Sequence, residues 1–198
     1  MHSSIQSRAP VFCAAALALA VSTVSWPESA SARSNWSIDP ARTHIGFSID
    51  AVGWPRTVGK FERFEGRIAV DFDHPAQSRV SFHVQAQSVD VGSPGFSDYV
   101  RSSVLLDAAR FPTIDFASTA VEKLDDHRVR ITGELTLLGV TRPLSVDVDV
   151  SKRADGGHTR LAFTAKARID RLEFGMNSGF PVISRDVDLT ISSEAQEL

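Results

Sequence analysis

The feature that most constrains this chain is an alternation of apolar and polar residues that recurs from Asn35 onward. In the first clear example, Ile45, Phe47 and Ile49 are separated by small or polar residues. Successive side chains of a β-strand point to opposite faces, so this spacing places the apolar side chains of a segment on one side. One-sided strands are typical of antiparallel sheets, because buried parallel strands are apolar throughout. The pattern therefore predicts antiparallel β-structure.

About eight such segments follow one another, and turn signals such as Asp73-His74-Pro75 separate them. No helical pattern alternates with the segments, which excludes βαβ units and a nucleotide-binding fold. Only Ser97–Leu106 has helical spacing, and we expect this short helix to lie across a rim. The predicted strands cover residues 45–49, 68–72, 80–86, 114–116, 129–137, 144–150, 161–169 and 187–191.

Eight one-sided strands can form a sandwich or a closed barrel. A barrel of this size is either filled by its own side chains or wide enough to hold one small ligand. Small residues stand on several apolar faces where a solid core would carry Leu or Ile, and they favour a hollow interior: Ala86, Gly133, Ala165 and Ala167. The pattern alone leaves both the filled and the hollow barrel open.

The N-terminal segment has the order of a secretory signal peptide. A polar start is followed by the uncharged apolar run Val11–Val24, and Ala30 and Ala32 supply the small residues of a cleavage site. The apolar run is shorter than the roughly 20 residues that a membrane span needs. We therefore expect residues 1–32 to be cleaved, leaving an exported domain, 33–198, without a stable membrane anchor. Cys13 is the only cysteine, so cleavage would leave no disulfide and no thiolate site.

Charge and motifs argue against several functions. The formal net charge of −3 gives no electrostatic reason to bind nucleic acid. The segment Gly175–Gly179 is not a nucleophile elbow, because it lacks the G-x-S-x-G order and no helical pattern follows it. The histidines after residue 32 form no metal-binding motif: His44, His74, His83, His127 and His158. We expect neither an enzyme nor a metal or other cofactor.

Several segments, in order and at consistent spacing, resemble the YceI-like lipid/polyisoprenoid-binding family of bacterial periplasmic proteins. The resemblance runs from Trp36 to about Ala195. The opening segment is WSIDPARTHIGF, and the longest is YVRSSVLLDAARFPTIDF, which begins at Tyr99. The other segments are GKFERFEG, SVDVG, ITGELTLLGVTRPL, RLEFGM and VDLTI. Tyr99 and Val104 depart from the family, which commonly has a histidine and an acidic residue there.

This resemblance implies an all-β fold: an extended, lipocalin-like, eight-stranded antiparallel barrel with an elongated apolar cavity. It also implies a periplasmic location and a hydrophobic lipid ligand, such as a prenyl chain; the only bound group expected is such an isoprenoid or another lipid. The residues expected at the mouth, where a head group would be read, are Asp98, Tyr99, Arg101 and Arg171. The residues expected in the cavity wall are Phe47, Ile49, Phe61, Phe64, Ile68, Phe72, Phe82, Val84, Phe116, Ile131, Leu135, Phe163 and Phe174.

Two other functions stay open at this point. A solid-core barrel could act as an interaction module whose rim loops, Gly53–Gly59 and Gly92–Val104, bind a membrane protein such as a quinone-linked one. An enzyme acting on lipids would need convergent polar groups inside the barrel, whereas the strand pattern points polar residues outward. The sequence also leaves open whether the chain forms a homodimer.

Overall fold

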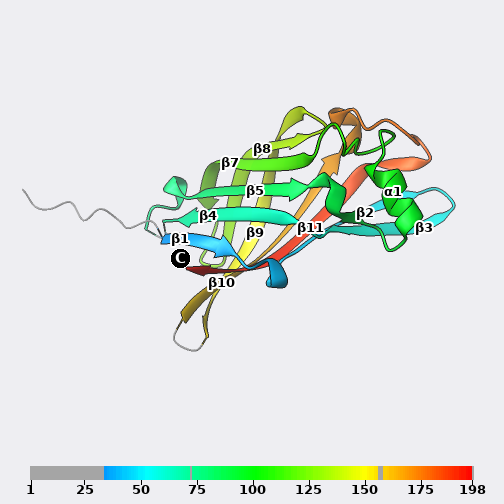
Figure 1. Cartoon of the computed structure of the whole chain (residues 1–198). Coiled ribbons are helices and arrows are strands. Elements are labelled where there is room, and N and C mark those ends of the chain that lie inside the picture. Colours follow the sequence, from blue (N-terminus) through cyan, green and yellow to red (C-terminus); the bar gives the residue numbers. More distant parts are fainter. Residues whose placement is uncertain (1–33, 72, 156–157, 198) are drawn as a thin grey trace, which may run out of the picture. The chain divides into compact units, whose positions relative to one another are not determined.

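The computed structural model describes residues 34–71, 73–155 and 158–197 (Figure 1). The predicted signal peptide, 1–32, with Cys13, and Phe72 lie outside the described residues. The helix is α1 (Pro94–Arg101). The strands are β1 (Ser34–Ile38), β2 (His44–Ala51), β3 (Trp54–Phe61), β4 (Phe64–Val70), β5 (Arg79–Gln85), β6 (Val89–Asp90), β7 (Thr113–Lys123), β8 (Arg128–Leu137), β9 (Val140–Asp155), β10 (His158–Asp170) and β11 (Ile183–Glu197).

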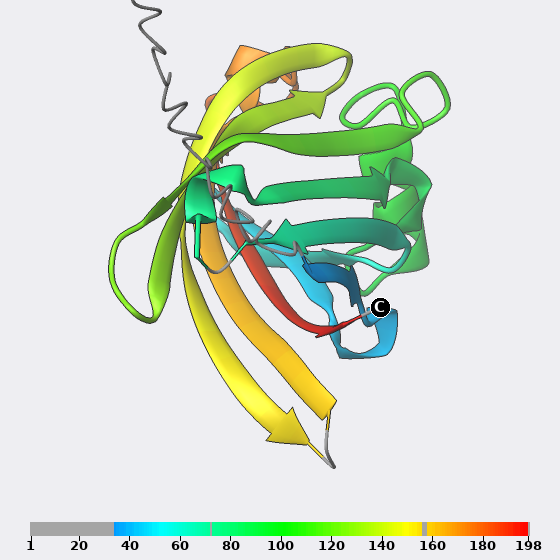
Figure 2. The same cartoon turned by 90° about the vertical axis from the view of Figure 1, so that its left-hand side faces the viewer.

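The strands form a closed antiparallel barrel. Eight of them follow one another around it in the order β1-β4-β5-β7-β8-β9-β10-β11, and pairing of β1 with β11 closes the ring. This closing pairing runs from Trp36 opposite Glu197 to Ile38 opposite Ala195. Figure 2 shows the sheet curving round on itself. The predicted eight-stranded antiparallel barrel is confirmed.

Three of the barrel strands are interrupted and continue as a second element. β2 extends β1 along the edge of β11, β3 pairs with β2, and β6 pairs with β3. The first break is the 3-10 turn η1 (Pro40–Arg42), where Asp39 accepts a hydrogen bond from the Ala41 amide at 3.0 Å. The others are residues 62–63 and the 3-10 turn η3 (Ala86–Ser88). Phe61 and Phe64 therefore flank a bend, which explains why they do not alternate simply.

A bulge in β7 changes which of its residues face inward. The register with β8 shifts between Ser118 and Ala120. An extra residue in one strand reverses the parity of the residues that follow it. Ile114 and Phe116 face the interior before the bulge, and Val121 faces it afterwards. The alternation in the sequence identified only the first pair.

The helix begins earlier and ends earlier than its sequence predicts. It runs over Pro94–Arg101, and turns replace it at residues 103–106. Proline suits the first helical turn, because an amide hydrogen there would have no hydrogen-bond partner within the helix. Ser97, where the predicted helix begins, instead lies inside the helix and is buried, and its hydroxyl accepts a hydrogen bond from the Val91 amide at 3.1 Å. This bond ties the helix to the end of β6.

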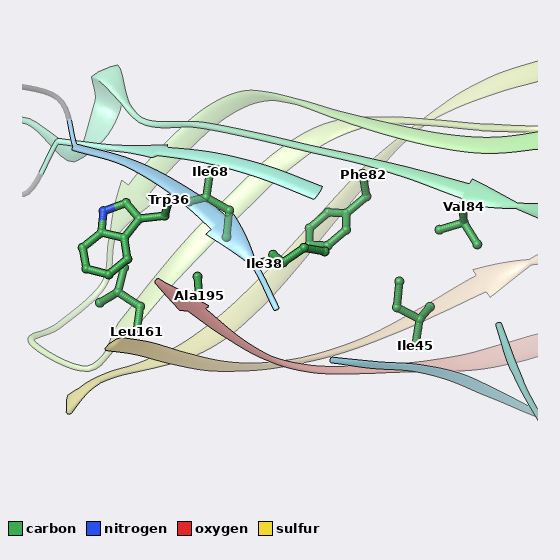
Figure 3. Packing of buried hydrophobic residues seen from close by; sticks show 8 residues of the cluster. All are labelled: Trp36, Ile38, Ile45, Ile68, Phe82, Val84, Leu161 and Ala195. Carbon is green, nitrogen blue, oxygen red and sulfur yellow. The ribbon is translucent and has the colours of Figure 1, made fainter. Parts of the chain in front are cut away.

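A compact group of buried side chains fills the barrel beside β1 (Figure 3). Trp36 and Ile38 from β1 meet Ile68 and Phe82 there, with Leu161 from β10. Burial of each such side chain is worth roughly 1.5–3 kcal/mol. The alternation did not predict β1, because five residues are too few to display it clearly. These side chains fill this side of the barrel, and several of them, including Ile68, Phe82 and Leu161, also border the cavity described below.

Candidate functional site

The barrel encloses a cavity of about 1340 Å³. This volume exceeds the roughly 300–1,000 Å³ of ordinary small-molecule pockets. Lining residues come from the α1 end, where Trp54 and Phe96 contribute, and from the β7–β8 turn at the opposite end, where Asp125 and His127 contribute. The cavity therefore extends along the barrel and has room for a long ligand. The hollow interior settles the question that the sequence pattern left open.

The wall of the cavity follows the period of two that the strands impose. On β10, Leu161, Phe163, Ala165, Ala167 and Ile169 all line it, while the residues between them face outward. The polar residues of the lining gather toward the two ends, so the middle of the wall is apolar. Most of the residues expected in the wall line the cavity: Phe47, Ile49, Phe61, Ile68, Phe82, Val84, Phe116, Ile131, Leu135 and Phe163. Their contact with a ligand stays a prediction.

Two residues expected in the wall lie elsewhere. Phe64 opens β4 directly after the bend and packs, half-buried, against the side chains around Trp36. Phe174 is 3% exposed and lies in the 3-10 turn η4 (Arg171–Phe174), outside the alternating strands, where it packs with Leu135 and Leu137. Neither is among the residues that line the cavity. The placement of Phe72 is not described.

Some wall residues were missed although the sequence carried their signal. The alternating faces of β9 and β11 contribute Val146, Val148, Leu189 and Ile191 to the lining. The same alternation that predicted their strands could have assigned them. No comparable signal exists for Trp54, because it lies beside the turn that joins β2 to β3, where apolar residues do not alternate.

Glycines allow large rings to lie flat against the wall. A Cβ atom at Gly59 would come within 2.3 Å of Cζ of Phe47, its partner across β2 and β3. Gly66 stands in the same relation to Phe82, with 2.9 Å between the added Cβ and the ring. Each ring therefore occupies the place that a side chain on the neighbouring strand would take. This packing leaves space along the axis of the barrel although the wall is rich in phenylalanine.

The small residues that favoured a hollow interior do not all contribute in the expected way. Ala165 and Ala167 line the cavity. The space beside Gly133 is taken by the ring of Phe116, whose Cζ atom would lie 2.5 Å from a Cβ there. Ala86 belongs to the turn η3 and is buried away from the lining.

Arg171 is buried, with 1% of its surface exposed, and its guanidinium donates hydrogen bonds to backbone carbonyls. Nε donates to the Ser184 carbonyl at 2.7 Å, and Nη2 donates to the Ile183 carbonyl at 2.9 Å. Nη1 donates to the carbonyls of Ser178, at 2.9 Å, and Met176. Burial lowers the pKa of Arg171 from its ordinary value, and the neighbouring Asp170 opposes this shift. Arg171 also lines the cavity, but these bonds show that it holds the loop before β11 in place.

The other residues expected at the mouth divide into two groups. Asp98 and Arg101 form an ion pair one helical turn apart, and Arg101 also donates to the Val89 carbonyl at 3.1 Å. Neither lines the cavity. Tyr99 does line it, and its ring stacks on that of Phe96 with 6.2 Å between the ring centres. Of the three residues on α1 that were expected at the mouth, Tyr99 is therefore the one that lines the cavity.

The opposite end of the cavity carries charges that pair within one turn. Lys123 lies 2.8 Å from Asp126, and Arg128 lies 2.8 Å from Asp125. The pKa of Asp125 is lowered by a hydrogen bond from the His127 amide and then by Arg128, and the pKa of Asp126 is lowered by Lys123. Within residues 34–71, 73–155 and 158–197, no three His, Cys, Asp or Glu side chains gather to hold a metal ion. The same ranges contain no helix that is long and apolar enough to cross a membrane.

Comparison with known proteins gives a consistent result. The sequence profile of the YceI-like domain matches residues 36–195. Protein YceI of Escherichia coli O157:H7 is 30% identical over 182 residues, which cover 90% of this chain and 95% of that protein.

Two solved structures share the fold. The crystal structure of BcnA from Burkholderia cenocepacia superposes with a TM-score of 0.74 at 22% identity and covers 80% of this chain and 99% of that one. A polyisoprenoid binding domain from Saccharophagus degradans has a TM-score of 0.65 at 14% identity and covers 82% of this chain and 98% of its own. At these identities the two structures bear on the fold alone.

Proposed function

Because the chain belongs to the YceI-like family, we propose that it is a periplasmic carrier that sequesters a polyisoprenoid or another long-chain apolar lipid. One observation carries the proposal, namely the apolar cavity of about 1340 Å³ that extends along the barrel. An elongated apolar space suits a ligand that is itself long and has little to hydrogen-bond. The relative from Saccharophagus degradans, described as a polyisoprenoid binding domain, supports the choice of ligand class.

The energetics of such a cavity are sufficient for tight binding. Burial of one methylene contributes about 0.8 kcal/mol, so a five-carbon isoprene unit is worth roughly 4 kcal/mol before other terms. Three or four units would reach about nanomolar affinity, from which ordering and association subtract. An apolar wall discriminates poorly between chains of similar width. Selection of the head group therefore falls to the polar ends of the cavity, and Tyr99 is positioned for it at the α1 end.

The hollow interior favours this carrier over the solid interaction module. A rim that binds a quinone-linked membrane protein needs no cavity, because a barrel filled by its own side chains would hold the rim loops equally well. A wall of alternating apolar residues around an open axis has a direct use only if something apolar enters it.

A binding role without catalysis also fits the arrangement of polar groups. His83 and Asp115 lie 2.6 Å apart, but the neighbouring Thr113 hydroxyl donates to Asp115 and not to the imidazole. A nucleophile must instead contact the base that activates it. The charged pairs at both ends of the cavity are likewise engaged with each other, so none converges on a reacting atom.

Extraction of the purified protein tests the proposal. The protein is isolated from its native host without detergent, its native mass is measured, and an organic extract is analysed by mass spectrometry. We expect a mass excess that matches an extracted long-chain lipid. The absence of any retained lipid, together with failure to take up an added polyprenol or fatty alcohol, would contradict the proposed function. Retention of a membrane protein in place of a lipid would favour the interaction module.

A further inference from the structure

Exposed apolar side chains gather at the α1 end of the barrel. Val52 and Trp54, at the tip of the β2–β3 hairpin, are 76% and 74% exposed. Large exposed side chains on α1 and on the loop before β11 accompany them, and all three segments lie at the same end in Figure 1. We call these six residues the apolar collar: Val52, Trp54, Phe96, Tyr99, Phe180 and Val182.

The collar borders the cavity at the α1 end of the barrel. The Val52 amide donates to the Val182 carbonyl at 2.9 Å, which joins the hairpin tip to the loop before β11. On α1, the rings of Phe96 and Tyr99 stack. Every collar residue except Val52 also lines the cavity. The exposed apolar surface is therefore the edge of the same apolar surface that forms the interior.

The charges beside the collar are already paired. Arg56 lies 3.4 Å from Asp50 and also pairs with Asp188, which Arg168 contacts as well at 2.7 Å. On α1, Arg101 pairs with Asp98. These pairs carry no excess of one sign, and the chain as a whole is mildly acidic. This surface suits a partner that is apolar and electrically neutral.

We propose that the apolar collar docks on the surface of a lipid bilayer, with the hairpin tip at Val52 and Trp54 inserted among the lipids. Tryptophan and tyrosine combine an apolar ring with a polar handle, and they favour the boundary between water and lipid. Docking brings the cavity entrance against the bilayer, so a lipid enters or leaves without crossing water. The purpose of docking rests on the proposed function, but docking itself does not require cargo.

A bilayer fits the collar better than a second copy of the chain does. Protein interfaces carry about one hydrogen bond per 100–200 Å². The collar consists mainly of side chains without hydrogen-bonding groups, and its neighbouring charges pair within the chain. A lipid surface makes no such geometric demand, because it adapts its shape to the groups that enter it.

Vesicle flotation with the purified protein tests this proposal. The vesicles contain phosphatidylcholine alone, and a second set adds an anionic lipid. We expect flotation with both sets and little dependence on salt, since the interaction is not electrostatic. Trp54 emission should shift to shorter wavelength on binding and be quenched by brominated lipid. The Trp54→Phe variant assigns this signal, because Trp26 belongs to the segment expected to be cleaved and Trp36 is 2% exposed and already shielded from water.

Two matched double variants locate the contact. Val52→Asp with Phe180→Asp adds two charges to the collar, and vesicle affinity should fall about tenfold or more. Ala120→Asp with Thr190→Asp adds the same charges to exposed positions on the outer barrel surface and should leave affinity unchanged. All four positions are exposed, so both proteins should fold.

Three results would overturn the proposal: no flotation of the unsubstituted protein, flotation only on anionic vesicles at low salt, or equal affinity of the two double variants. A dimer that the collar variant alone dissociates would assign the collar to a second copy instead. Extracted lipid is measured on the same samples. Retained cargo without vesicle binding refutes docking alone, whereas vesicle binding by a protein that neither retains nor takes up a lipid refutes the proposed function alone.

Discussion

Narrowing the cavity from its wall is the most direct perturbation of the proposed cargo site. Ala167 lies on the inward face of β10 and lines the cavity. The Ala167→Phe variant places a phenyl ring there, which displaces about one five-carbon isoprene unit of a bound chain. At about 0.8 kcal/mol per methylene, the loss approaches 4 kcal/mol, or about three orders of magnitude in Kd. The ring enters empty space, so we expect no loss of thermal stability.

The assay measures lipid per chain after purification and the Kd for an added polyprenol, by displacement of a fluorescent apolar dye. Lys166→Phe is the control, because Lys166 is exposed on the outer face of the same strand. This control should bind like the unsubstituted chain. If Ala167→Phe folds, melts normally and still binds with unchanged Kd, the ligand does not occupy this part of the cavity and the reasoning is refuted.

Three further outcomes concern stability. Arg171→Met removes the donors to four backbone carbonyls and should lower the free energy of unfolding in urea by about 3–5 kcal/mol. The control Arg168→Met, at an exposed position, should change this free energy little, and equal effects of the two variants would contradict the role given to Arg171. Gly133→Ala places a Cβ 2.5 Å from the Ala117 carbonyl oxygen and from the Phe116 ring, and it should lower the free energy of unfolding by about 1–3 kcal/mol. The control Gly95→Ala meets no neighbouring atom and should leave the stability unchanged or raise it. A tolerated Gly133→Ala would show that the ring moves freely. Asp147, Asp170 and Asp188 accept hydrogen bonds from arginine, which lowers the pKa of each carboxyl below its ordinary value near 4. These carboxylates therefore stabilise the fold above that pH, and the effect is lost as the pH falls through the lowered pKa. The melting temperature should be flat from pH 7 to about 5 and fall below about 4, and a rise on acidification would contradict this reasoning.

The strands and their inward faces were predictable because a period of two is written directly in the sequence. The run of β10 from Leu161 to Ile169 faces inward as its alternation predicts. The prediction failed where the backbone departs from regularity. The bulge in β7 moves the inward face to Val121, and the bend before β4 removes Phe64 from the wall. Irregularities of this kind depend on neighbouring strands and leave no periodic signal.

The backbone contacts of Arg171 were not predictable for a different reason. Its partners are backbone carbonyls, which every residue possesses. A sequence therefore records no complementary residue type, and an arginine near a barrel mouth looks like a ligand for a head group. The collar was equally hidden, because its members come from three segments that only the closed barrel brings to one end.

The pairing of phenylalanine with glycine across neighbouring strands has a consequence for the calibre of the barrel. A ring such as that of Phe47 takes up wall area above Gly59 and does not reach toward the axis. The width of the cavity thus depends on pairs of residues, and a count of the bulky residues alone underestimates this width. At these paired positions an engineer would have to exchange both members at once, because altering one member alone either leaves a gap in the wall or forces a ring across the channel.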